Sequence, residues 1–428
     1  MDTIFALATA PGKAGVAVVR ISGPKAHIAA ELLAGRRPPL RKASLCRLKD
    51  SSGAHLDSGL VLLFPQGASF TGEPVAELQL HGARATVAAV LRSLSDINGL
   101  RQAEPGEFTR RALENGVMDL TEVEGLADLI EAETEAQRRQ ALRVLSGDLA
   151  DIVAEWRSDL IGILSLVEVT IDFADEEVPV DVTPDVSIAL DRLIDSLSRE
   201  LAGISTAERV RDGFEVAIVG PSNIGKSTLL NRLARREAAL VSDIAGTTRD
   251  IVEVRMDLGG VLVTFLDTAG MRLTDDVVEN LGISRAKARA EEADLRIILT
   301  DGTDPVMPPR TPQDLVVHGK GDLLDGCLPR ISGLTGAGVA ELLDHVREVF
   351  SERVSAIGTA TTERHRTALK SALQALESAR DRLGSLAAQT DLVAEDLRQA
   401  VRALDTMTGR IDAEDVLDQI FSAFCLGK

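Results

Sequence analysis

The segment that most constrains the fold is an apolar stretch followed by a glycine-rich loop and a helical pattern. Residues 214–219 read FEVAIV, which is typical of a buried strand, and GPSNIGKS follows at 220–227 before the helical run TLLNRLARRE. The glycines let the backbone curl so that its N–H groups point toward phosphate oxygens, and the helix N-terminus adds positive potential. A GxxxxGKS sequence in this strand–loop–helix setting predicts a nucleotide-binding domain built on a parallel sheet.

The side chains of this loop have separate expected tasks. Lys226 is predicted to reach the β- and γ-phosphates, and the Ser227 hydroxyl is predicted to bind Mg²⁺. The predicted nucleotide contacts of the loop are Asn223, Ile224, Gly225, Lys226, Ser227 and Thr228. Asn223 has a second interpretation, in which it only braces the loop.

Four further segments of a GTP site follow along the chain, around Thr248, Asp267, Asp322 and Ser332. Thr248, in a polar segment, has a hydroxyl that can complete the Mg²⁺ shell and sense the γ-phosphate. Asp267 ends an apolar run that is expected to be a strand, and it fits a direct or indirect Mg²⁺ role. The Asp322 carboxylate can accept two N–H bonds from guanine but would repel the corresponding edge of adenine. The other predicted contacts are Ser242, Asp243, Ile244, Ala245, Gly246, Thr247, Thr268, Ala269, Gly270, Gly319, Lys320, Ser332 and Gly333.

This segment resembles the G domains of translation-factor-class GTPases, and the TTRD sequence at residues 247–250 is typical of their Era/Der/TrmE branch. The family's guanine motif is NKxD, and here Gly319 takes the place of the asparagine. Because one side-chain clamp is lost, we expect nucleotide binding to be weaker by about 1–3 kcal/mol.

Hydrolysis needs a water-orienting group and positive charge beside the transferred phosphate. Ras-like enzymes carry a glutamine where this chain has Met271, so Glu279 is the candidate for orienting water, with a solvated helix-cap acid as the alternative. No arginine finger is identifiable, and a K⁺ ion held by the P-loop and the polar segment is expected to take its place. The predicted K⁺ ligands are Asn223, Ser242, Ile244 and Thr247, and the predicted Mg²⁺ ligands are Ser227 and Thr248.

The rest of the chain divides into an α+β part and a helical part. Residues 1–117 alternate apolar runs with Gly and Pro, and IFALATA, GVAVVRIS, LDSGLVLLF and VAELQLHG are predicted strands. Helical spacing of Ala, Leu and Glu dominates residues 118–212 and returns in 354–428. These patterns predict a multidomain α/β protein with an N-terminal α+β domain, a discontinuous all-α domain, and a Ras-like doubly wound G domain inserted at 213–353.

The formal net charge of −19 argues at first against a surface that grips nucleic acid. However, residues 118–212 hold 8 basic and 23 acidic side chains, whereas residues 1–117 hold 14 basic and 10 acidic ones. The acidity is therefore local and excludes nothing for the first domain. Three cysteines without metal spacing, the lack of a long apolar run and an acidic rather than basic start lead us to expect a cytoplasmic protein without a membrane span or secretory signal.

Motifs outside the G domain resemble the MnmE (TrmE) family of tRNA-modification GTPases. They are the opening DTIFALATAPGKAGVAVVRISGP, FTGEP at residues 70–74, ELQLHG at 77–82, PGEFT at 105–109 and the terminal FCLGK. In that family an N-terminal folate-binding, dimerising domain and a helical domain flank an inserted G domain. The resemblance covers nearly the whole chain and implies the same architecture.

The resemblance also implies a function in modifying the wobble uridine of certain tRNAs. With a flavin-dependent partner, MnmG, family members build an aminomethyl-type group at C5, using a tetrahydrofolate derivative (5,10-methylene or 5-formyl) as the one-carbon source. GTP hydrolysis, activated by K⁺ and by G-domain dimerisation, drives their conformational cycle. We therefore expect a homodimer that forms a heterotetramer-type complex with MnmG, and we expect that partner to hold most of the tRNA.

The family's site positions fall on particular residues of this sequence. Its folate contacts, water-orienting glutamate and K⁺-binding asparagine fall on Arg20, Glu77, Lys428, Glu279 and Asn223. A further folate position, usually lysine, is Val117 here, so one cationic contact is missing. Cys425 is expected to be either a nucleophile or general acid toward the uridine intermediate, or a small buried hydrophobe.

Two other functions are consistent with parts of the sequence. One is a ribosome-assembly GTPase of the Era/Der type, without covalent tRNA chemistry. Such proteins carry a KH domain or a second G domain, and the sequence has neither a GXXG-bearing segment after the G domain nor a second P-loop. The other is a folate-binding module whose nucleotide site is only a regulatory sensor, an option that Gly319 keeps open.

Overall fold

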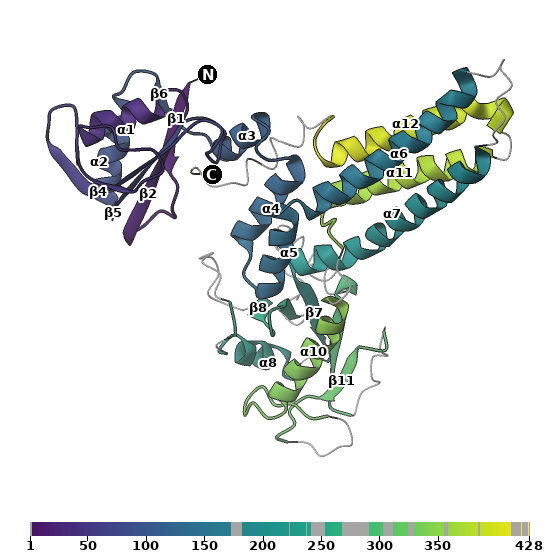
Figure 1. The fold of residues 1–428 in the computed structure, drawn as a ribbon. Helices are drawn as coiled ribbons and strands as arrows, with labels where there is room; N and C mark the ends of the chain where they lie inside the picture. Colours follow the sequence, from purple (N-terminus) through teal and green to yellow (C-terminus); the bar gives the residue numbers. More distant parts are fainter. Residues whose placement is uncertain are drawn as a thin grey trace, which may run out of the picture. The chain divides into compact units, whose positions relative to one another are not determined.

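The chain forms two compact units, one made of residues 1–127 with 402–428 and the other of residues 128–401 (Figure 1). The computed structural model describes residues 2–172, 182–221, 223–236, 238–240, 253–267, 291–302, 311–323, 329–354, 358–383, 386–411, 421 and 427. The four domain segments expected from the sequence, with boundaries after residues 117, 212 and 353, stay predictions.

The first unit is built on a six-stranded sheet in the order β3-β4-β5-β2-β1-β6. Neighbouring strands are antiparallel except β1 and β6, which are parallel. The strands are β1 (Thr3–Leu7), β2 (Ala14–Ser22), β3 (Ser44–Lys49), β4 (His55–Phe64), β5 (Val75–Gly82) and β6 (Leu100–Gln102). The four predicted strand segments correspond to β1, β2, β4 and β5, whereas the sequence patterns did not indicate β3 or β6.

Alternation along these strands produces two apolar cores, because successive side chains point to opposite faces of a sheet. One core contains Ile21 and Leu78 and is closed by α1 (Ala26–Ala34) and α2 (Arg84–Ser95). The other contains Ile4 and Phe108, the latter from α3 (Glu107–Glu114). This second, smaller core fixes α3 beside β1. The neighbouring strands β2 and β5 carry the candidate folate residues Arg20 and Glu77.

One part of the second unit is built from long helices, which come from two stretches far apart in sequence (Figure 1). They are α4 (Leu120–Glu131), α5 (Glu135–Leu145), α6 (Asp148–Asp172), α7 (Thr183–Asp212), α11 (Glu363–Arg382) and α12 (Leu386–Met407), of which α4 and α12 also contribute residues to the first unit. An ion pair of 2.8 Å between Arg398 and Glu168 joins α12 to α6, and one of 3.6 Å between Arg380 and Asp191 joins α11 to α7. Trp156 is buried on α6.

Between α7 and α11 lies a second sheet in the order β11-β10-β7-β9-β8, parallel except for β8. Its elements are β7 (Phe214–Val219), α8 (Lys226–Leu233), β8 (Glu253–Asp257), β9 (Leu262–Asp267), β10 (Leu295–Thr300), β11 (Leu315–His318) and α10 (Val339–Val354). Phe214 and Phe350 stack with ring centroids 4.3 Å apart, which fixes α10 against β7. This is the predicted doubly wound G domain, interrupting the helical part.

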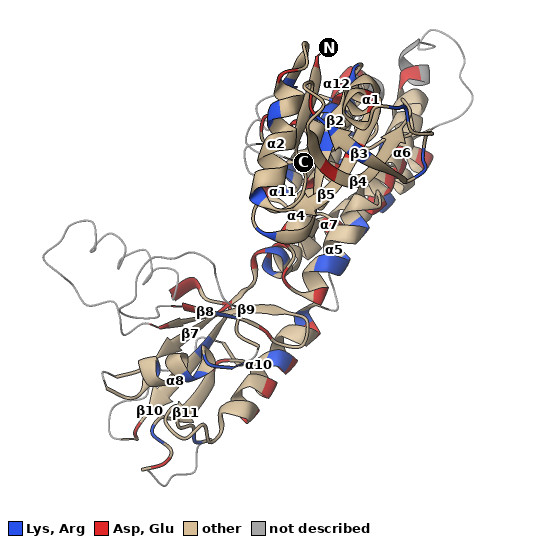
Figure 2. Cartoon of the chain, turned by 90° about the vertical axis from the view of Figure 1, so that its left-hand side faces the viewer, with Lys and Arg blue, Asp and Glu red and all other residues tan. Residues whose placement is uncertain are grey.

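Acidic and basic side chains are interspersed along α5 and α10 (Figure 2), as is usual for helices with a solvated face. No helix in the described part of the chain is long and apolar enough to cross a membrane.

Candidate functional site

The glycine-rich loop begins at the carboxyl end of β7, the central strand of the five-stranded sheet. At Gly220 (φ 150°) an added Cβ would lie 2.5 Å from the carbonyl oxygen of Leu299 on β10, so only glycine fits there. Gly225 (φ 108°) forms the N-cap of α8, and Asn223 has a left-handed φ of 62°. The loop thus turns sharply into the helix N-terminus, which is the geometry that exposes backbone N–H groups to phosphate.

Lys226 is 5% exposed, and its ammonium donates to the carbonyl oxygens of Gly220 and Pro221, each at 2.7 Å. Burial lowers the pKa of Lys226, and the negative charge of Asp267 opposes that shift. A cation held this way against its own loop is placed where the phosphates of a bound nucleotide would lie.

Ser227 and Asp267 come together as candidate Mg²⁺ groups. Asp267 ends β9, is 3% exposed, and accepts a hydrogen bond of 2.6 Å from the Ser227 hydroxyl. The described residues contain no cluster of three or more His, Cys, Asp or Glu that could hold a metal ion. Two neighbouring oxygen groups fit Mg²⁺, which takes few protein ligands and completes its shell with water and phosphate oxygens.

Two further loops converge on the P-loop. Gly319, after β11, donates its N–H to the Thr300 carbonyl at 3.0 Å, and a Cβ there would lie 2.7 Å from the carbonyl oxygen of Ile224. Gly333 lies against α8, where a Cβ would be 2.6 Å from the Leu229 nitrogen. These contacts bring the predicted guanine loops beside the P-loop.

Asp322, the predicted guanine acceptor, is exposed on this loop. The hydrogen bond from the buried Ser332 hydroxyl lowers the pKa of the Asp322 carboxyl. The carboxylate form that guanine recognition requires is therefore stabilised before any ligand arrives. Lys320, next to it, has a left-handed φ of 54°.

Several predicted site residues lie outside the described part of the chain. They are Ser242, Asp243, Ile244, Ala245, Gly246, Thr247, Thr248, Thr268, Ala269, Gly270, Glu279, Cys425 and Lys428.

The first unit brings together two of the predicted folate residues. Arg20 on β2 and Glu77 on β5 are direct cross-strand neighbours, and the Arg20 Nε donates to Glu77 Oε1 at 3.0 Å. The guanidinium carbon lies 5.1 Å from the Phe70 ring centroid and 5.8 Å from that of Phe108. Both charged side chains are 19% exposed, so this pair is shielded but reachable. Both phenylalanines belong to motifs of the sequence, FTGEP and PGEFT, but no sequence pattern indicates that they contact Arg20.

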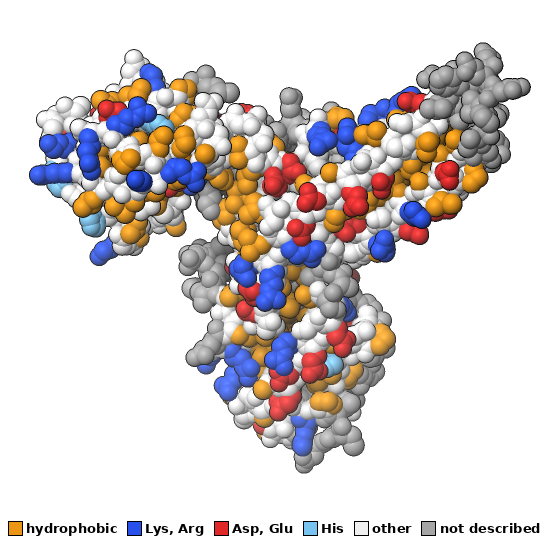
Figure 3. Space-filling view, in the orientation of Figure 1, with side chains coloured by type: hydrophobic (Ala, Val, Ile, Leu, Met, Phe, Trp, Pro, Cys, Tyr) orange, Lys and Arg blue, Asp and Glu red, His pale blue; other side chains and the backbone are white. Residues whose placement is uncertain are grey.

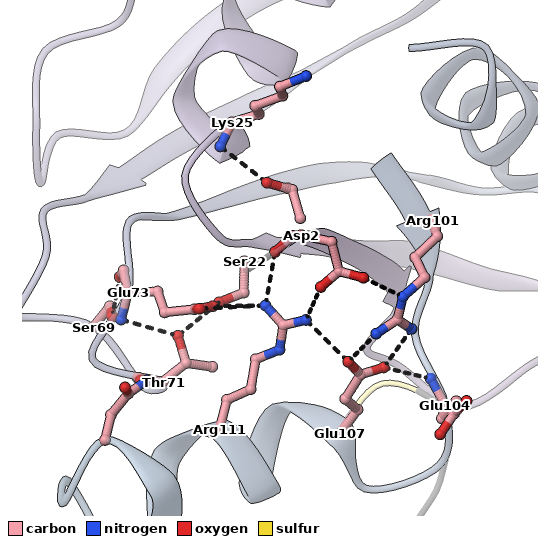
Figure 4. A network of polar contacts seen from close by, with 12 residues as sticks. Asp2, Ser22, Lys25, Ser69, Thr71, Glu73, Arg101, Glu104, Glu107 and Arg111 are labelled. Carbon is pink, nitrogen blue, oxygen red and sulfur yellow. Dashed lines mark hydrogen bonds and ion pairs between the residues drawn. The ribbon is translucent and has the colours of Figure 1, made fainter. Parts of the chain in front are cut away.

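A buried polar network holds the FTGEP segment (residues 70–74) and the PGEFT segment (residues 105–109) together (Figure 4). The Arg111 guanidinium pairs with Asp2, Glu73 and Glu107 at 2.8, 3.1 and 3.0 Å, and Arg101 pairs with Glu107 at 2.5 Å. Burial raises the pKa of Glu107, but hydrogen bonds from the two arginines outweigh it, so the pKa is lowered. Since Glu73 belongs to FTGEP and Glu107 to PGEFT, the network holds Phe70 and Phe108 next to Arg20.

The end of the chain lies against the same sheet. A Cβ at Gly427 would be 2.1 Å from the carbonyl oxygen of Leu7, the residue after Ala6, which pairs with Arg20. Phe421 is 1% exposed, under the Arg110 guanidinium at 5.0 Å. The residue before the predicted folate contact Lys428 is therefore in the unit that carries Arg20.

The second unit has a polar cavity of about 400 Å³ that none of the predicted site residues lines. Its walls come from α4, α5, the end of α7 and β8, and they include Gln140, whose buried Oε1 has no hydrogen-bond partner. This cavity is not the nucleotide site, which is formed by the loops around Lys226.

Since the phosphate loop, the Ser227–Asp267 pair and the Asp322 loop meet at one edge of a mostly parallel sheet, the chain is a P-loop GTPase. Residues 3–117 match the family model of the GTP-binding protein TrmE N-terminus, and residues 120–425 match that of the MnmE helical domain. The chain belongs to the MnmE family of tRNA modification GTPases.

The relatives are similar over their full length. A tRNA modification GTPase MnmE from Ruegeria pomeroyi is 58% identical over 428 residues, and one from Cereibacter sphaeroides is 58% identical over 430 residues, with 100% of each chain covered. The solved G domain of FeoB from Methanococcus jannaschii is 20% identical, with a TM-score of 0.23, over 33% of this chain and 98% of that one, and adds nothing to the assignment. The protein is thus a GTP hydrolase of tRNA modification that binds GTP and Mg²⁺.

Proposed function

We propose that this GTPase is activated by K⁺ and, with a flavin-dependent partner of the MnmG type, installs an aminomethyl-type group at C5 of the wobble uridine. A tetrahydrofolate derivative would supply the one-carbon unit. The protein would act in the cytoplasm as a homodimer within a heterotetramer-type complex. The observation that supports this proposal best is the shielded Arg20–Glu77 pair with two phenylalanine rings close to the Arg20 guanidinium, in a chain of this family.

In the GTPase step, the chain's own groups bind and orient the nucleotide. Lys226 would exchange the carbonyl oxygens of Gly220 and Pro221 for phosphate oxygens, and Ser227 with Thr248 would bind Mg²⁺. Asp322 would accept the guanine N–H groups. Glu279 would orient the attacking water, because Met271 cannot.

A monovalent cation would supply the charge that an arginine supplies elsewhere. Asn223, with its left-handed φ, lies in the middle of the P-loop, and it would hold K⁺ together with Ser242, Ile244 and Thr247. This assignment comes from the family pattern and from the residue types.

The Arg20 site has the chemistry that a folate requires. Glu77 can accept hydrogen bonds from the amino and ring N–H groups of a pterin, and Arg20 and Lys428 can pair with carboxylates. Phe70 and Phe108 supply aromatic surface beside the pair. Cys425 would then act on the uridine intermediate or pack as a small hydrophobe, and Cys425→Ser would separate these roles by its effect on modification at unchanged GTP turnover.

The experiment that tests the GTPase part compares GTP turnover in K⁺ and in Na⁺ for the wild type and for Glu279→Ala. K⁺ should accelerate the wild type, and the alanine variant should lose most of its turnover while still binding GTP. Equal rates in both salts would reject the cation mechanism, and normal turnover in the variant would reject Glu279.

The pathway is tested by analysing the wobble uridine of tRNA from a deletion strain that carries either the wild type or Glu77→Gln. We expect unmodified wobble positions in the deletion strain and in the Gln variant, together with loss of folate binding by the purified variant. A normal wobble profile with an rRNA-processing defect would favour the ribosome-assembly alternative.

A further inference from the structure

Residues 36–49, called here the basic segment, carry the densest positive charge of the first unit. They read RRPPLRKASLCRLK, with six basic and no acidic side chains in a chain of net charge −19. The segment forms the loop after α1 and all of β3, an edge strand of the six-stranded sheet. Lys and Arg side chains accordingly gather over the first unit in Figure 3.

Within the described ranges, these cations have no carboxylate partners. The basic side chains of the segment are all exposed, and among the described residues none forms an ion pair; they are Arg36, Arg37, Arg41, Lys42, Arg47 and Lys49. Several surface arginines elsewhere are paired; Arg138 and Arg139, for example, both reach Glu135 at 2.7 Å. In a chain with 66 acidic residues, six neighbouring cations without counter-charge repel one another and remain available to an external polyanion.

Protection of an edge strand explains only part of this pattern. Charged residues on edge strands prevent pairing between sheets, and Arg47 and Lys49 on β3 suit that purpose. The other four cations precede β3 and protect no strand edge. Arg41 even occupies a left-handed backbone conformation (φ 56°), where glycine or asparagine would be less strained.

We propose that the basic segment contacts the phosphate backbone of the tRNA substrate. The proposal rests on the chain's role in tRNA modification and on the charge of the segment; only its distance to the Arg20 site also uses the folate assignment, and the K⁺ assignment plays no part. Unpaired Lys and Arg side chains are what RNA phosphates require, and Arg47 and Lys49 lie about 7 Å apart on one face of β3.

The position of the segment also suits a substrate that must reach the Arg20 site. Strand register places Arg47, opposite Ser58, on the same face of the sheet as Glu77 and Arg20. Three strand spacings and four residues along the strands separate Arg47 from Arg20, or about 20 Å. One RNA stem-loop could therefore touch the basic segment with its backbone while presenting a base near Arg20.

The test measures binding of full-length protein to unmodified tRNA at several salt concentrations. The variant is Arg41→Glu/Lys42→Glu/Arg47→Glu, and the matched control is Arg192→Glu/Arg199→Glu/Lys370→Glu, which makes the same charge change on exposed positions of α7 and α11. We expect tRNA binding by the first variant to be at least about tenfold weaker at 0.1 M salt, with the logarithmic salt slope reduced by about 2–3. The control should bind like the wild type.

GTP turnover shows whether the variants are correctly folded. Neither triple variant alters a nucleotide-site residue, so both should hydrolyse GTP at the wild-type rate. Three results would overturn the proposal: wild-type protein without salt-dependent tRNA binding, equal losses in both triple variants, or unchanged tRNA affinity in the first variant. If that variant instead lost only its binding to the flavin-dependent partner, the segment would be a protein docking surface.

Discussion

Gly319 lacks the guanine-contacting side chain of related G domains, but its packing against the P-loop requires a residue without a Cβ. The asparagine of related G domains adds a side-chain clamp, and its absence predicts weaker nucleotide binding. The structure adds a steric reason for glycine, because a Cβ would lie 2.7 Å from the carbonyl oxygen of Ile224 in the P-loop. Sequence alone could reveal the missing clamp, but not the close approach of two loops that are far apart in the chain.

Restoring the family residue should therefore not restore the clamp. We expect Gly319→Asn to weaken GTP binding by about 1–2 kcal/mol, roughly five- to thirtyfold, because the loop must shift away from Ile224. Gly319→Ala should cause a similar loss, since the Cβ is responsible. Titration with a fluorescent GTP analogue measures both, and tighter binding by the Asn variant would show that the loop relaxes at little cost.

Glu107 makes the first unit sensitive to acid. Its pKa is lowered from 4.5 by the two arginines, so its stabilisation is present above that value and is lost as pH falls through the lower folded pKa. Glu107→Gln should lower the free energy of unfolding at pH 7 by about 2–3 kcal/mol, because Arg111 keeps its charge in a buried site. The difference between wild type and variant should shrink as pH falls below about 4, and denaturant unfolding at pH 7 and pH 3.5 measures it. A constant difference would mean that the ion pairs contribute little.

Among the elements, the sequence after residue 118 predicts helix but does not show where one helix ends and the next begins. It breaks into α4, α5 and α6, with α5 starting at a capping box in which Thr134 and Gln137 bond each other's backbone N–H groups. The TxxQ pattern is visible in the sequence, yet the uniform Ala, Leu and Glu spacing hides it. The break matters because the Ala136 N–H, at the start of α5, donates to the carbonyl of Gly260 in the turn between β8 and β9 at 2.9 Å.

Gln137 should be the residue on which this junction depends. Its Oε1 accepts from the N–H groups of Glu133 and Thr134 at 2.9 and 3.0 Å, and its Nε2 donates to the Arg211 carbonyl at 2.8 Å. Gln137→Ala removes these bonds and should destabilise the protein by about 2–3 kcal/mol, whereas Gln137→Glu loses the bond to Arg211 but keeps the oxygen that accepts from Glu133 and Thr134, so the first turn of α5 should stay protected. Hydrogen exchange of the first turn of α5 reports the loss, and equal effects of both variants would contradict a role of the cap.

For the whole molecule, the split helical part with an inserted G domain followed from the sequence, because helical periodicity stops at the P-loop strand and resumes after α10. The internal organisation of the first unit did not follow. β3 is short and basic and reads as a loop, and the contacts of Arg111 join residues up to 109 positions apart. Such contacts leave no local pattern.

Two compact units should unfold as two transitions. The chain has one tryptophan, Trp156, which is buried in the second unit and donates to Ser196 at 3.0 Å, so its fluorescence reports that unit alone. In Glu107→Gln, the first unit should melt at a lower temperature, which circular dichroism would record as a separate early step. Each 1 kcal/mol of lost stability lowers a melting temperature by several degrees, or about 4–8 °C for a small domain. The Trp156 transition should stay within about 1 °C of the wild type, and a joint shift would show that the units unfold together.

The packing of Phe421 and Gly427 into the first unit has a consequence for protein synthesis. About 270 residues of the second unit are translated between the two parts of the first. At elongation rates of about 5–20 residues per second, the nascent N-terminal sheet waits roughly 15–55 s for Phe421 and Gly427. During that interval the surface beside Gly106, which Phe421 covers in the folded protein, stays exposed to solvent on the ribosome. The unit that is synthesised first is therefore completed last.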